Sequence, residues 1–253
     1  AVYKALDIAS AFRKKDIEVR VIMTESATKF VAPLTFQSIS QNMVVTDMFA
    51  EPKAWEIQHI SLAQKADCLL VAPATANIIG KVANGIADDM LSTTIMACKS
   101  KVIFAPAMNT NMYENPIVQG NIEKLKSLGY EFIEPDSGRL ACGDIGKGKF
   151  PKPEVIVERV LTELHDKKDL VNKKVVISAG PTRSDLDPVR FISNRSTGKM
   201  GYEIAKEARD RGAEVVLVSG PVSLDEPQGV KTIKVSTNAE MYEKVKENYD
   251  DAD

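Results

Sequence analysis

Three residues of this chain have side chains that suit proton transfer or the binding of a carboxylate: His59, Asn109 and Cys142. Imidazole is the side-chain group that most often serves as an acid or a base near neutral pH, so His59 is a candidate for proton transfer. The amide of Asn109 has donors and an acceptor, so it can orient a carboxylate or a carbonyl without adding a charge. The thiol of Cys142 lies in a glycine-rich loop that can close over a site, where it would donate a proton. Taken singly, His59 is also consistent with a surface or capping histidine, and Asn109 with a simple chain reversal.

The other cysteines and the second histidine have plainer interpretations. Cys68 lies in an apolar run and Cys98 at the end of a predicted helix, where a thiol usually serves as a small apolar filler. His165 lies in a charged segment and is expected to be solvated. Three cysteines cannot all be paired within one chain, so the pattern favours a reducing compartment and a cytoplasmic protein.

Polar residues follow three predicted strands at the point where each strand ends. Residues 67–72 and 101–105 are largely apolar, as parallel strands covered on both faces are, and a third strand is expected at residues 18–23. Because the carboxyl ends of parallel strands share one edge of a sheet, where ligands bind, these loops should converge on one site. The loop residues expected to contact a cofactor are Thr24, Ser26, Ala74, Thr75 and Asn77. Ser26 is also consistent with the N-cap of a helix.

Predicted helices alternate with the strands along the chain, for example at residues 1–15 and 153–165. A segment at 134–151 is rich in glycine, aspartate, serine and proline, and it is predicted to be a long functional loop. The alternation predicts an α/β fold: a Rossmann-like, flavodoxin-type parallel sheet flanked by helices, followed by the start of a second Rossmann-like α/β domain.

A charged, polar link near residue 168 predicts a boundary between domains 1–168 and 169–253. The second domain opens with a strand at 174–179, and small, hydroxyl and cationic residues cluster in the turns that follow. N–H groups at a helix start and nearby cations bind anions, so this cluster suits phosphates, although it is not a Walker motif. The expected phosphate contacts are Gly180, Thr182, Ser196, Gly198 and Lys199. A basic, solvated loop is the alternative interpretation.

Composition and charge exclude several classes of partner. The net charge is −2 and there is no long basic run, so there is no electrostatic basis for binding nucleic acid or an anionic membrane. No apolar stretch approaches the roughly 18 residues that span a bilayer. With 44% hydrophobic and 27% charged residues, the chain has the composition of a folded globular protein. Small-molecule substrates are the expected partners.

Five segments have an order and spacing similar to those of the flavin-dependent cysteine decarboxylases. The segments lie at residues 59–62, 72–77, 84–89, 106–112 and 141–143. The resemblance extends over the whole chain and is greatest to the bifunctional enzymes of coenzyme A biosynthesis. Their decarboxylase half converts 4'-phosphopantothenoylcysteine to 4'-phosphopantetheine. The resemblance implies FMN as cofactor and a homo-oligomer, a trimer or a multiple of trimers, with the flavin site between subunits.

The resemblance also implies roles by position. His59 corresponds to the catalytic histidine, Asn109 to the asparagine that orients the substrate carboxylate, and Cys142 to the thiol that protonates the enethiolate. Met112 joins Asn109 as a substrate contact. A simple amino acid carboxylate has no electron sink, and oxidation of the cysteinyl CH2–S unit by a flavin would create one.

The run at residues 187–201 resembles the ligase half of the same enzymes, which uses CTP and Mg²⁺ to activate 4'-phosphopantothenate before cysteine attacks. Arg190 and Asn194 correspond to residues that handle the acyl-nucleotide intermediate. From the same resemblance we expect a first strand with a glycine-containing loop upstream of this chain and further nucleotide-binding segments downstream of it. We therefore expect the second domain to bind phosphates without completing the ligation.

Two other functions remain open. One is a flavin-dependent decarboxylase of peptides that end in cysteine, and the ligase-like second domain argues against it. The other is a non-enzymatic flavoprotein that regulates a partner, and the joint presence of His59, Asn109 and Cys142 argues against that.

Overall fold

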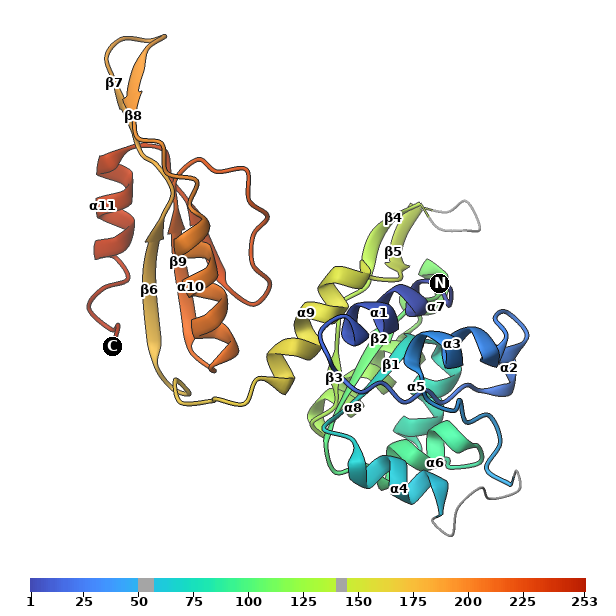
Figure 1. Ribbon diagram of the computed structural model, residues 1–253. Coiled ribbons are helices and arrows are strands. Elements are labelled where there is room, and N and C mark those ends of the chain that lie inside the picture. Colours follow the sequence, from blue (N-terminus) through green and yellow to red (C-terminus); the bar gives the residue numbers. More distant parts are fainter. Residues whose placement is uncertain (50–56, 140–144) are drawn as a thin grey trace. The chain divides into compact units, whose positions relative to one another are not determined.

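The computed structural model describes residues 1–49, 57–139 and 145–253. It divides into two compact units, residues 1–160 and residues 161–253, which are described separately. Each unit contains a three-stranded parallel sheet with helices packed against it, so the predicted α/β class is confirmed (Figure 1).

The sheet of the first unit has the order β1-β2-β3 (Cys68–Ala74, Lys101–Pro106, Glu131–Phe132). Burial explains the long apolar run of β2, in which every residue after Lys101 is buried. The ring of Phe104 stacks on that of Phe132 at a centroid distance of 5.0 Å. The ladder between β1 and β2 shifts register between Val71 and Ala74, next to a cis peptide bond at Ala72–Pro73.

Helices and one hairpin complete the first unit. The helices are α1 (Lys4–Arg13), α2 (Glu25–Thr28), α3 (Pro33–Ser40), α4 (Gln58–Lys65), α5 (Ala76–Ala83), α6 (Met90–Ala97), α7 (Thr110–Tyr113), α8 (Pro116–Ser127) and α9 (Pro153–Leu164). Among them, α5 turns Ile78, Ile79 and Val82 into the core beside β1 and β2, as the spacing of an amphipathic helix requires. The antiparallel strands β4 (Asp136–Arg139) and β5 (Ile145–Lys149) form the hairpin.

Two sequence-based expectations about this unit are wrong. Residues 18–23 do not form a strand of the sheet, because Ile22 alone makes a parallel bridge, to Val45. The segment 134–151 is not an irregular loop, because β4 and β5 pair within it. The strands were not predicted because glycine has no side chain, so a glycine-rich strand shows no alternation of apolar and polar residues.

The second unit has a parallel sheet of order β10-β9-β6 (Lys231–Lys234, Glu214–Ser219, Lys174–Ala179). The helix α10 (Lys199–Asp210) packs against β6 and β9, and α11 (Asn238–Lys246) lies beside the same strands. A short antiparallel hairpin of β7 (Arg183–Asp185) and β8 (Phe191–Ser193) extends past the end of β6 (Figure 1).

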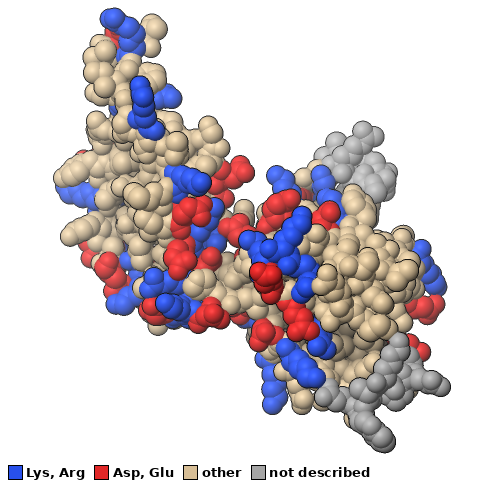
Figure 2. Space-filling model, in the orientation of Figure 1, with Lys and Arg blue, Asp and Glu red and all other residues tan. Residues whose placement is uncertain are grey.

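Acidic and basic side chains are interspersed on the face that Figure 2 shows, and neither sign forms an extended region there. This distribution agrees with the near-neutral net charge of −2.

Candidate functional site

The loops that follow β1 and β2 meet at the carboxyl edge of the first sheet. Ala74 pairs with Pro106 in the ladder, and the N–H of Ala107 donates to the carbonyl oxygen of Ala74 at 3.0 Å. Ala74 is completely buried at this junction. The first turn of α5 therefore begins next to the loop that carries Asn109, as expected for neighbouring parallel strands.

Asn109 is the N-cap of the short helix α7, and its Oδ1 accepts a hydrogen bond from the N–H of Asn111 at 2.9 Å. This bond fixes the orientation of the half-buried amide group. One turn further on, Met112 is 49% exposed and Tyr113 is buried. Asn109 thus takes part in a chain reversal, which was one of the two interpretations of the sequence. The same turn also holds its amide group in a defined orientation at the end of β2.

The stem of the hairpin β4–β5 lies against this loop. The N–H of Met108 donates to the carbonyl oxygen of Gly148 at 3.0 Å, and β5 packs against α7. Cys142 lies outside the described residues, between the two strands that form this stem. No pattern in the sequence predicted that Gly146 and Gly148 contact the Asn109 loop.

Thr75 and Asn77 open the helix α5. Thr75 occupies the N-cap position, but its hydroxyl makes no capping bond to the helix, and both side chains are exposed. The first N–H groups of a helix have no partner within it, and they carry the positive end of its dipole. This helix start can therefore receive an anionic group, with the Thr75 hydroxyl and the Asn77 amide beside it.

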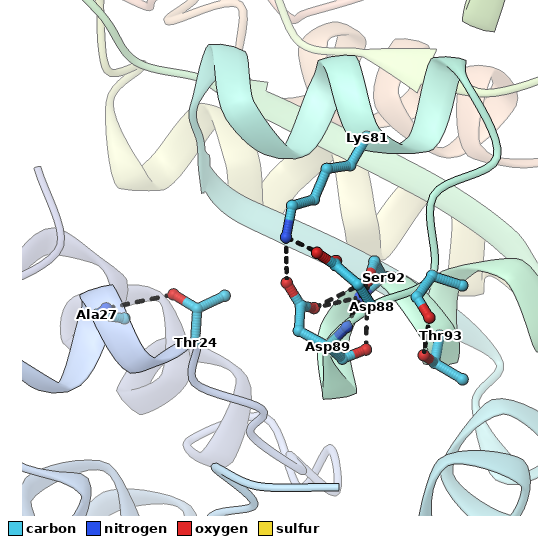
Figure 3. Close-up of polar contacts among 8 residues, drawn as sticks. Thr24, Ala27, Lys81, Asp88, Asp89, Ser92 and Thr93 are labelled. Atoms are coloured by element: carbon cyan, nitrogen blue, oxygen red, sulfur yellow. Dashed lines mark hydrogen bonds and ion pairs between the residues drawn. The ribbon is translucent and has the colours of Figure 1, made fainter.

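Thr24 and Ser26 lie at the start of α2. The Oγ1 of Thr24 accepts a hydrogen bond from the N–H of Ala27 at 3.2 Å, which makes Thr24 the N-cap (Figure 3). Ser26 is an exposed residue inside the helix, so the interpretation of Ser26 as a cap is wrong. Both residues have the right chemistry for the capping role, and only the backbone path decides between them.

His59 lies in the first turn of α4 and is half-buried. The helix α4 packs against α6. The structure thus positions His59 through a helix pair, whereas Asn109 and Thr75 lie on loops that a hydrogen bond joins directly.

The start of α6 is held by a charged cluster that sequence reasoning missed, although the segment 84–89 was noted. Lys81 Nζ lies 2.7 Å from the carboxylate of Asp88 and 2.9 Å from that of Asp89, and Asp89 forms a reciprocal capping box with Ser92 (Figure 3). Hydrogen bonds to Asp88 and Asp89 raise the pKa of Lys81. Burial opposes ionisation of Asp89, but hydrogen bonds from Ser92 and Lys81 outweigh it and lower the pKa of that carboxyl. The two ion pairs of Lys81 thus connect α5 to the start of α6.

A second ion pair connects the hairpin to the end of β3. Lys147 Nζ of β5 lies 2.7 Å from the carboxylate of Glu134 and 5.9 Å from the ring centroid of Tyr113. The hydrogen bond with Lys147 lowers the pKa of Glu134, while burial and the nearby Glu134 charge raise the pKa of Tyr113. Both charges of the pair are thus favoured near neutral pH.

Glycines in the second unit pack against each other at the carboxyl edge of its sheet. Gly180 follows β6 with φ +79°, and Gly198 is the N-cap of α10 with φ +76°. A Cβ on either residue would lie 2.8 Å from Cγ1 of Val222, and a Cβ on Gly201 would lie 2.6 Å from the Cβ of Ala179. The sequence pointed to Gly180 and Gly198, and Val222 is the neighbour that it missed.

Hydroxyl and amide groups shape the turn before α10. The Oδ1 of Asn194 accepts from the N–H of Ser196 at 2.9 Å, and the Oγ of Ser196 accepts from the N–H of Gly198 at 3.3 Å. Thr182 donates its hydroxyl proton to the side chain of Asn238. Lys199 is exposed in the first turn of α10.

Arg190 lies earlier in the chain, in the turn of the β7–β8 hairpin, where its Nε lies 2.6 Å from the carboxylate of Asp187. Backbone N–H groups of Val189 and Arg190, together with the Arg190 side chain, lower the pKa of Asp187. The guanidinium is 76% exposed and can turn toward an anionic ligand.

Two family models match this chain. The model described as Flavoprotein matches residues 1–165, and the model described as DNA/pantothenate metabolism flavoprotein C-terminal domain matches residues 170–253. This chain belongs to the flavoprotein family. The flavoprotein match covers the unit in which the Asn109 and Thr75 loops meet. The predicted boundary at 168/169 stays a prediction.

Curated relatives of this flavoprotein include the coenzyme A biosynthesis bifunctional protein CoaBC of Bacillus subtilis, 53% identical over 258 residues. That alignment covers 100% of this chain and 63% of the relative. The protein of the same name from Borreliella burgdorferi is 45% identical, with 98% and 64% covered. The chain thus spans less than two thirds of the length of these relatives.

Solved structures resemble the flavoprotein unit. A PPC decarboxylase variant complexed with pantothenoylaminoethenethiol has a TM-score of 0.56 and 32% identity, covering 63% of this chain and 89% of that one. The FMN binding protein AtHal3 has a TM-score of 0.55 and 33% identity, with 63% and 88% covered. The FMN-dependent cysteine decarboxylase SpaF has a TM-score of 0.53 and 30% identity, with 62% and 87% covered.

Within the described ranges 1–49, 57–139 and 145–253, no helix combines the length and the apolar character needed to cross a bilayer. The same part of the chain contains no group of three His, Cys, Asp or Glu side chains arranged to hold a metal ion.

Proposed function

We propose that the first domain of this flavoprotein, residues 1–168, catalyses the FMN-dependent decarboxylation of 4'-phosphopantothenoylcysteine to 4'-phosphopantetheine in coenzyme A biosynthesis. The observation that carries the proposal is the hydrogen bond from Ala107 N–H to Ala74 O, which joins the α5 start to the Asn109 loop. The relatives agree with it, because they include bifunctional coenzyme A biosynthesis proteins and a PPC decarboxylase with a bound pantothenoyl compound.

The residues at this sheet edge fit FMN. The start of α5 offers N–H groups that the Thr75 side chain does not cap, beside Thr75 and Asn77, and these suit a single phosphate. The small, buried Ala74 leaves room for a planar ring to approach the backbone. Thr24 and Ser26 are proposed as further contacts. The chemistry that FMN supplies when bound is reversible two-electron transfer, which creates the electron sink that loss of a carboxylate needs.

The chain's own residues bind the substrate and handle its protons. The bond from Asn111 N–H to Oδ1 orients the Asn109 amide, and its NH2 side is the donor that a substrate carboxylate requires. A neutral donor holds the carboxylate without stabilising it as strongly as a cation would, so its departure remains feasible. Met112 contributes apolar contact, His59 acts as acid or base, and Cys142 donates the proton that completes the product.

For the second domain, residues 169–253, we propose binding of the phosphates of CTP as part of a ligase that joins 4'-phosphopantothenate to cysteine. The adjoining glycines 180 and 198 support this, since neither brings a side chain of its own to the turn where α10 begins, and the first N–H groups of a helix suit a phosphate. Thr182, Ser196 and Lys199 would add donors, and Arg190 and Asn194 would contact the acyl-nucleotide. Mg²⁺ would be held mainly by the nucleotide phosphates and water, as is usual for this ion.

The decisive experiment loads the purified chain with FMN and measures CO2 release from 4'-phosphopantothenoylcysteine and from a peptide that ends in cysteine. We expect turnover with the first substrate and little with the second. Preference for the peptide would favour the peptidyl-cysteine decarboxylase, and flavin binding without turnover of either would favour a regulatory flavoprotein. Light scattering on the same sample tests the expected homo-oligomer, a trimer or a multiple of trimers, and cell fractionation tests a cytoplasmic location.

A further inference from the structure

The strand β5 approaches the Asn109 loop more closely than side chains would permit. The carbonyl oxygen of Gly148 accepts a hydrogen bond from Met108 N–H at 3.0 Å. A Cβ built on Gly148 would lie 2.5 Å from the carbonyl oxygen of Met108 and 3.5 Å from the carbonyl carbon of Asn109. The first distance is an overlap with a backbone atom, which cannot swing away as a side chain would, and the second is an ordinary van der Waals contact.

A second glycine of β5 lies against the next residue of the same loop. A Cβ on Gly146 would lie 2.6 Å from both Oγ1 and Cγ2 of Thr110, the first residue of α7. Residues 146 and 148 are two apart on one strand, so they share a face, and that face lies against residues 108–110. Residues 108–110 of the Asn109 loop therefore pack against the two glycines of β5, which have no side chains to hold them away.

We propose that Gly146 and Gly148 are positioning residues for Asn109: their missing side chains let β5 hold the loop at the distance and orientation at which the amide meets the substrate carboxylate. The inference rests on the proposed decarboxylation for its kinetic consequence, but the contact itself is independent of it. A displacement of about 1 Å in a catalytic group can cost roughly 100-fold in rate, so even a small shift of the loop should be measurable.

The same hairpin contains a matched control. Gly138 of β4 is the ladder partner of Gly146 and has φ +146°, close to the φ of +134° at Gly148. A Cβ on Gly138 would meet only the flexible side chain of Lys149, at 3.8 Å. Gly138→Ala thus introduces similar backbone strain in the hairpin without touching the Asn109 loop.

The test compares Gly148→Ala and Gly138→Ala in the FMN-loaded chain by two measurements. One is kcat and KM for CO2 release from 4'-phosphopantothenoylcysteine. The other is the NMR spectrum of methyl-labelled methionines, because Met108 and Met112 flank Asn109 and report on the loop whether or not the enzyme turns over. We expect Gly148→Ala to shift both methyl signals and to lower kcat/KM by about 100-fold, with flavin still bound. Gly138→Ala should leave both measurements near those of the wild type.

Unchanged methyl signals in Gly148→Ala, or equal shifts in the two variants, would overturn the inference. If the wild type releases no CO2, the proposed function has failed, and the methyl signals still decide whether β5 positions the loop. Gly146→Ala combined with Thr110→Ala provides a rescue. The double change removes Oγ1 and Cγ2 but leaves the Thr110 Cβ at 3.1 Å, so it should restore part of what Gly146→Ala alone loses. Absence of any rescue would remove the Gly146–Thr110 contact from the proposal.

Discussion

The two units use glycine differently at their strand ends. In the flavoprotein unit, Gly146 and Gly148 belong to a hairpin, and they lie against a loop about 40 residues earlier in the sequence, so one element sets the position of another. In the second unit, Gly180 and Gly198 lie inside the turns that would receive the ligand, and their positive φ angles shape those turns directly. The first arrangement acts on a neighbouring loop, and the second shapes the turn in which the glycines themselves lie.

The comparison has a consequence for mutation. A substitution of Gly146 or Gly148 should alter the orientation of the Asn109 amide and leave the sheet intact. A substitution in the turns of the second unit should disturb the packing of the sheet edge itself. The following predictions test this difference, beginning with the largest expected effect.

Gly220→Ala should destabilise the second unit most strongly. A Cβ at this position would overlap the backbone carbonyl oxygen of Pro181, and two backbone segments cannot separate without breaking the sheet edge. We expect a loss of about 3 kcal/mol or more in the free energy of unfolding, measured by urea denaturation.

Gly120→Ala is the contrasting variant for that measurement. Gly120 lies in α8, where a Cβ would have open space, so alanine should stabilise the helix by about 0.5–1 kcal/mol. Equal denaturation midpoints for Gly220→Ala and the wild type would show that the turn tolerates the overlap, contrary to the close packing described for this unit.

Asn109→Asp should abolish decarboxylation and preserve the fold. Aspartate is as good an N-cap as asparagine, so α7 should remain intact, but its charge would repel the substrate carboxylate. We expect kcat/KM to fall by at least about 100-fold while thermal stability and flavin absorbance stay near those of the wild type. Near-normal turnover in this variant would remove Asn109 from the site.

Cys142→Ser should separate carboxylate loss from the final protonation. A serine hydroxyl is a much weaker acid than a thiol, so CO2 should still be released while the enethiolate accumulates. Stopped-flow absorbance would show a flavin that becomes reduced and returns slowly to the oxidised form. A complete cycle at the normal rate would mean that another group donates the proton.

Lys81→Met should have the smallest effect, a loss of about 1 kcal/mol or less at pH 7 because the cluster is partly exposed. The lowered pKa of Asp89 contributes stability above the unfolded-state pKa of about 4, and this contribution disappears as pH falls through the lower folded-state pKa. The raised pKa of Lys81 contributes stability below about pH 10, which is lost at higher pH.

The measurement is the difference in unfolding free energy between the wild type and Lys81→Met across the pH range. This difference should be constant near neutral pH and shrink in acid and in strong base. A difference that does not depend on pH would mean that the Lys81 stem contributes packing and not charge.

Local pattern was sufficient for much of this protein. The apolar runs before Ala74 and Pro106 predicted β1 and β2 because strands buried on both faces must be apolar throughout. The small and polar residues that follow them identified the Asn109 and Thr75 loops, because parallel strands end at one edge. The clustering of Gly180 with the start of α10 was likewise visible, since glycine, serine and asparagine favour such turns.

Tertiary structure decided what depends on contacts between distant segments. Among the described residues, Ile22 makes one isolated bridge, to Val45, so an apolar stretch that resembles a strand does not become one. Thr24 and not Ser26 caps α2, because a cap needs a backbone angle as well as a hydroxyl. In the sequence the glycines of β5 indicate a loop. Their close contacts with Met108 and Thr110 are seen only in the tertiary structure. The sequence shows which positions are glycine and therefore have no side chain. Only the tertiary structure shows which backbone segment packs into the space at each of them.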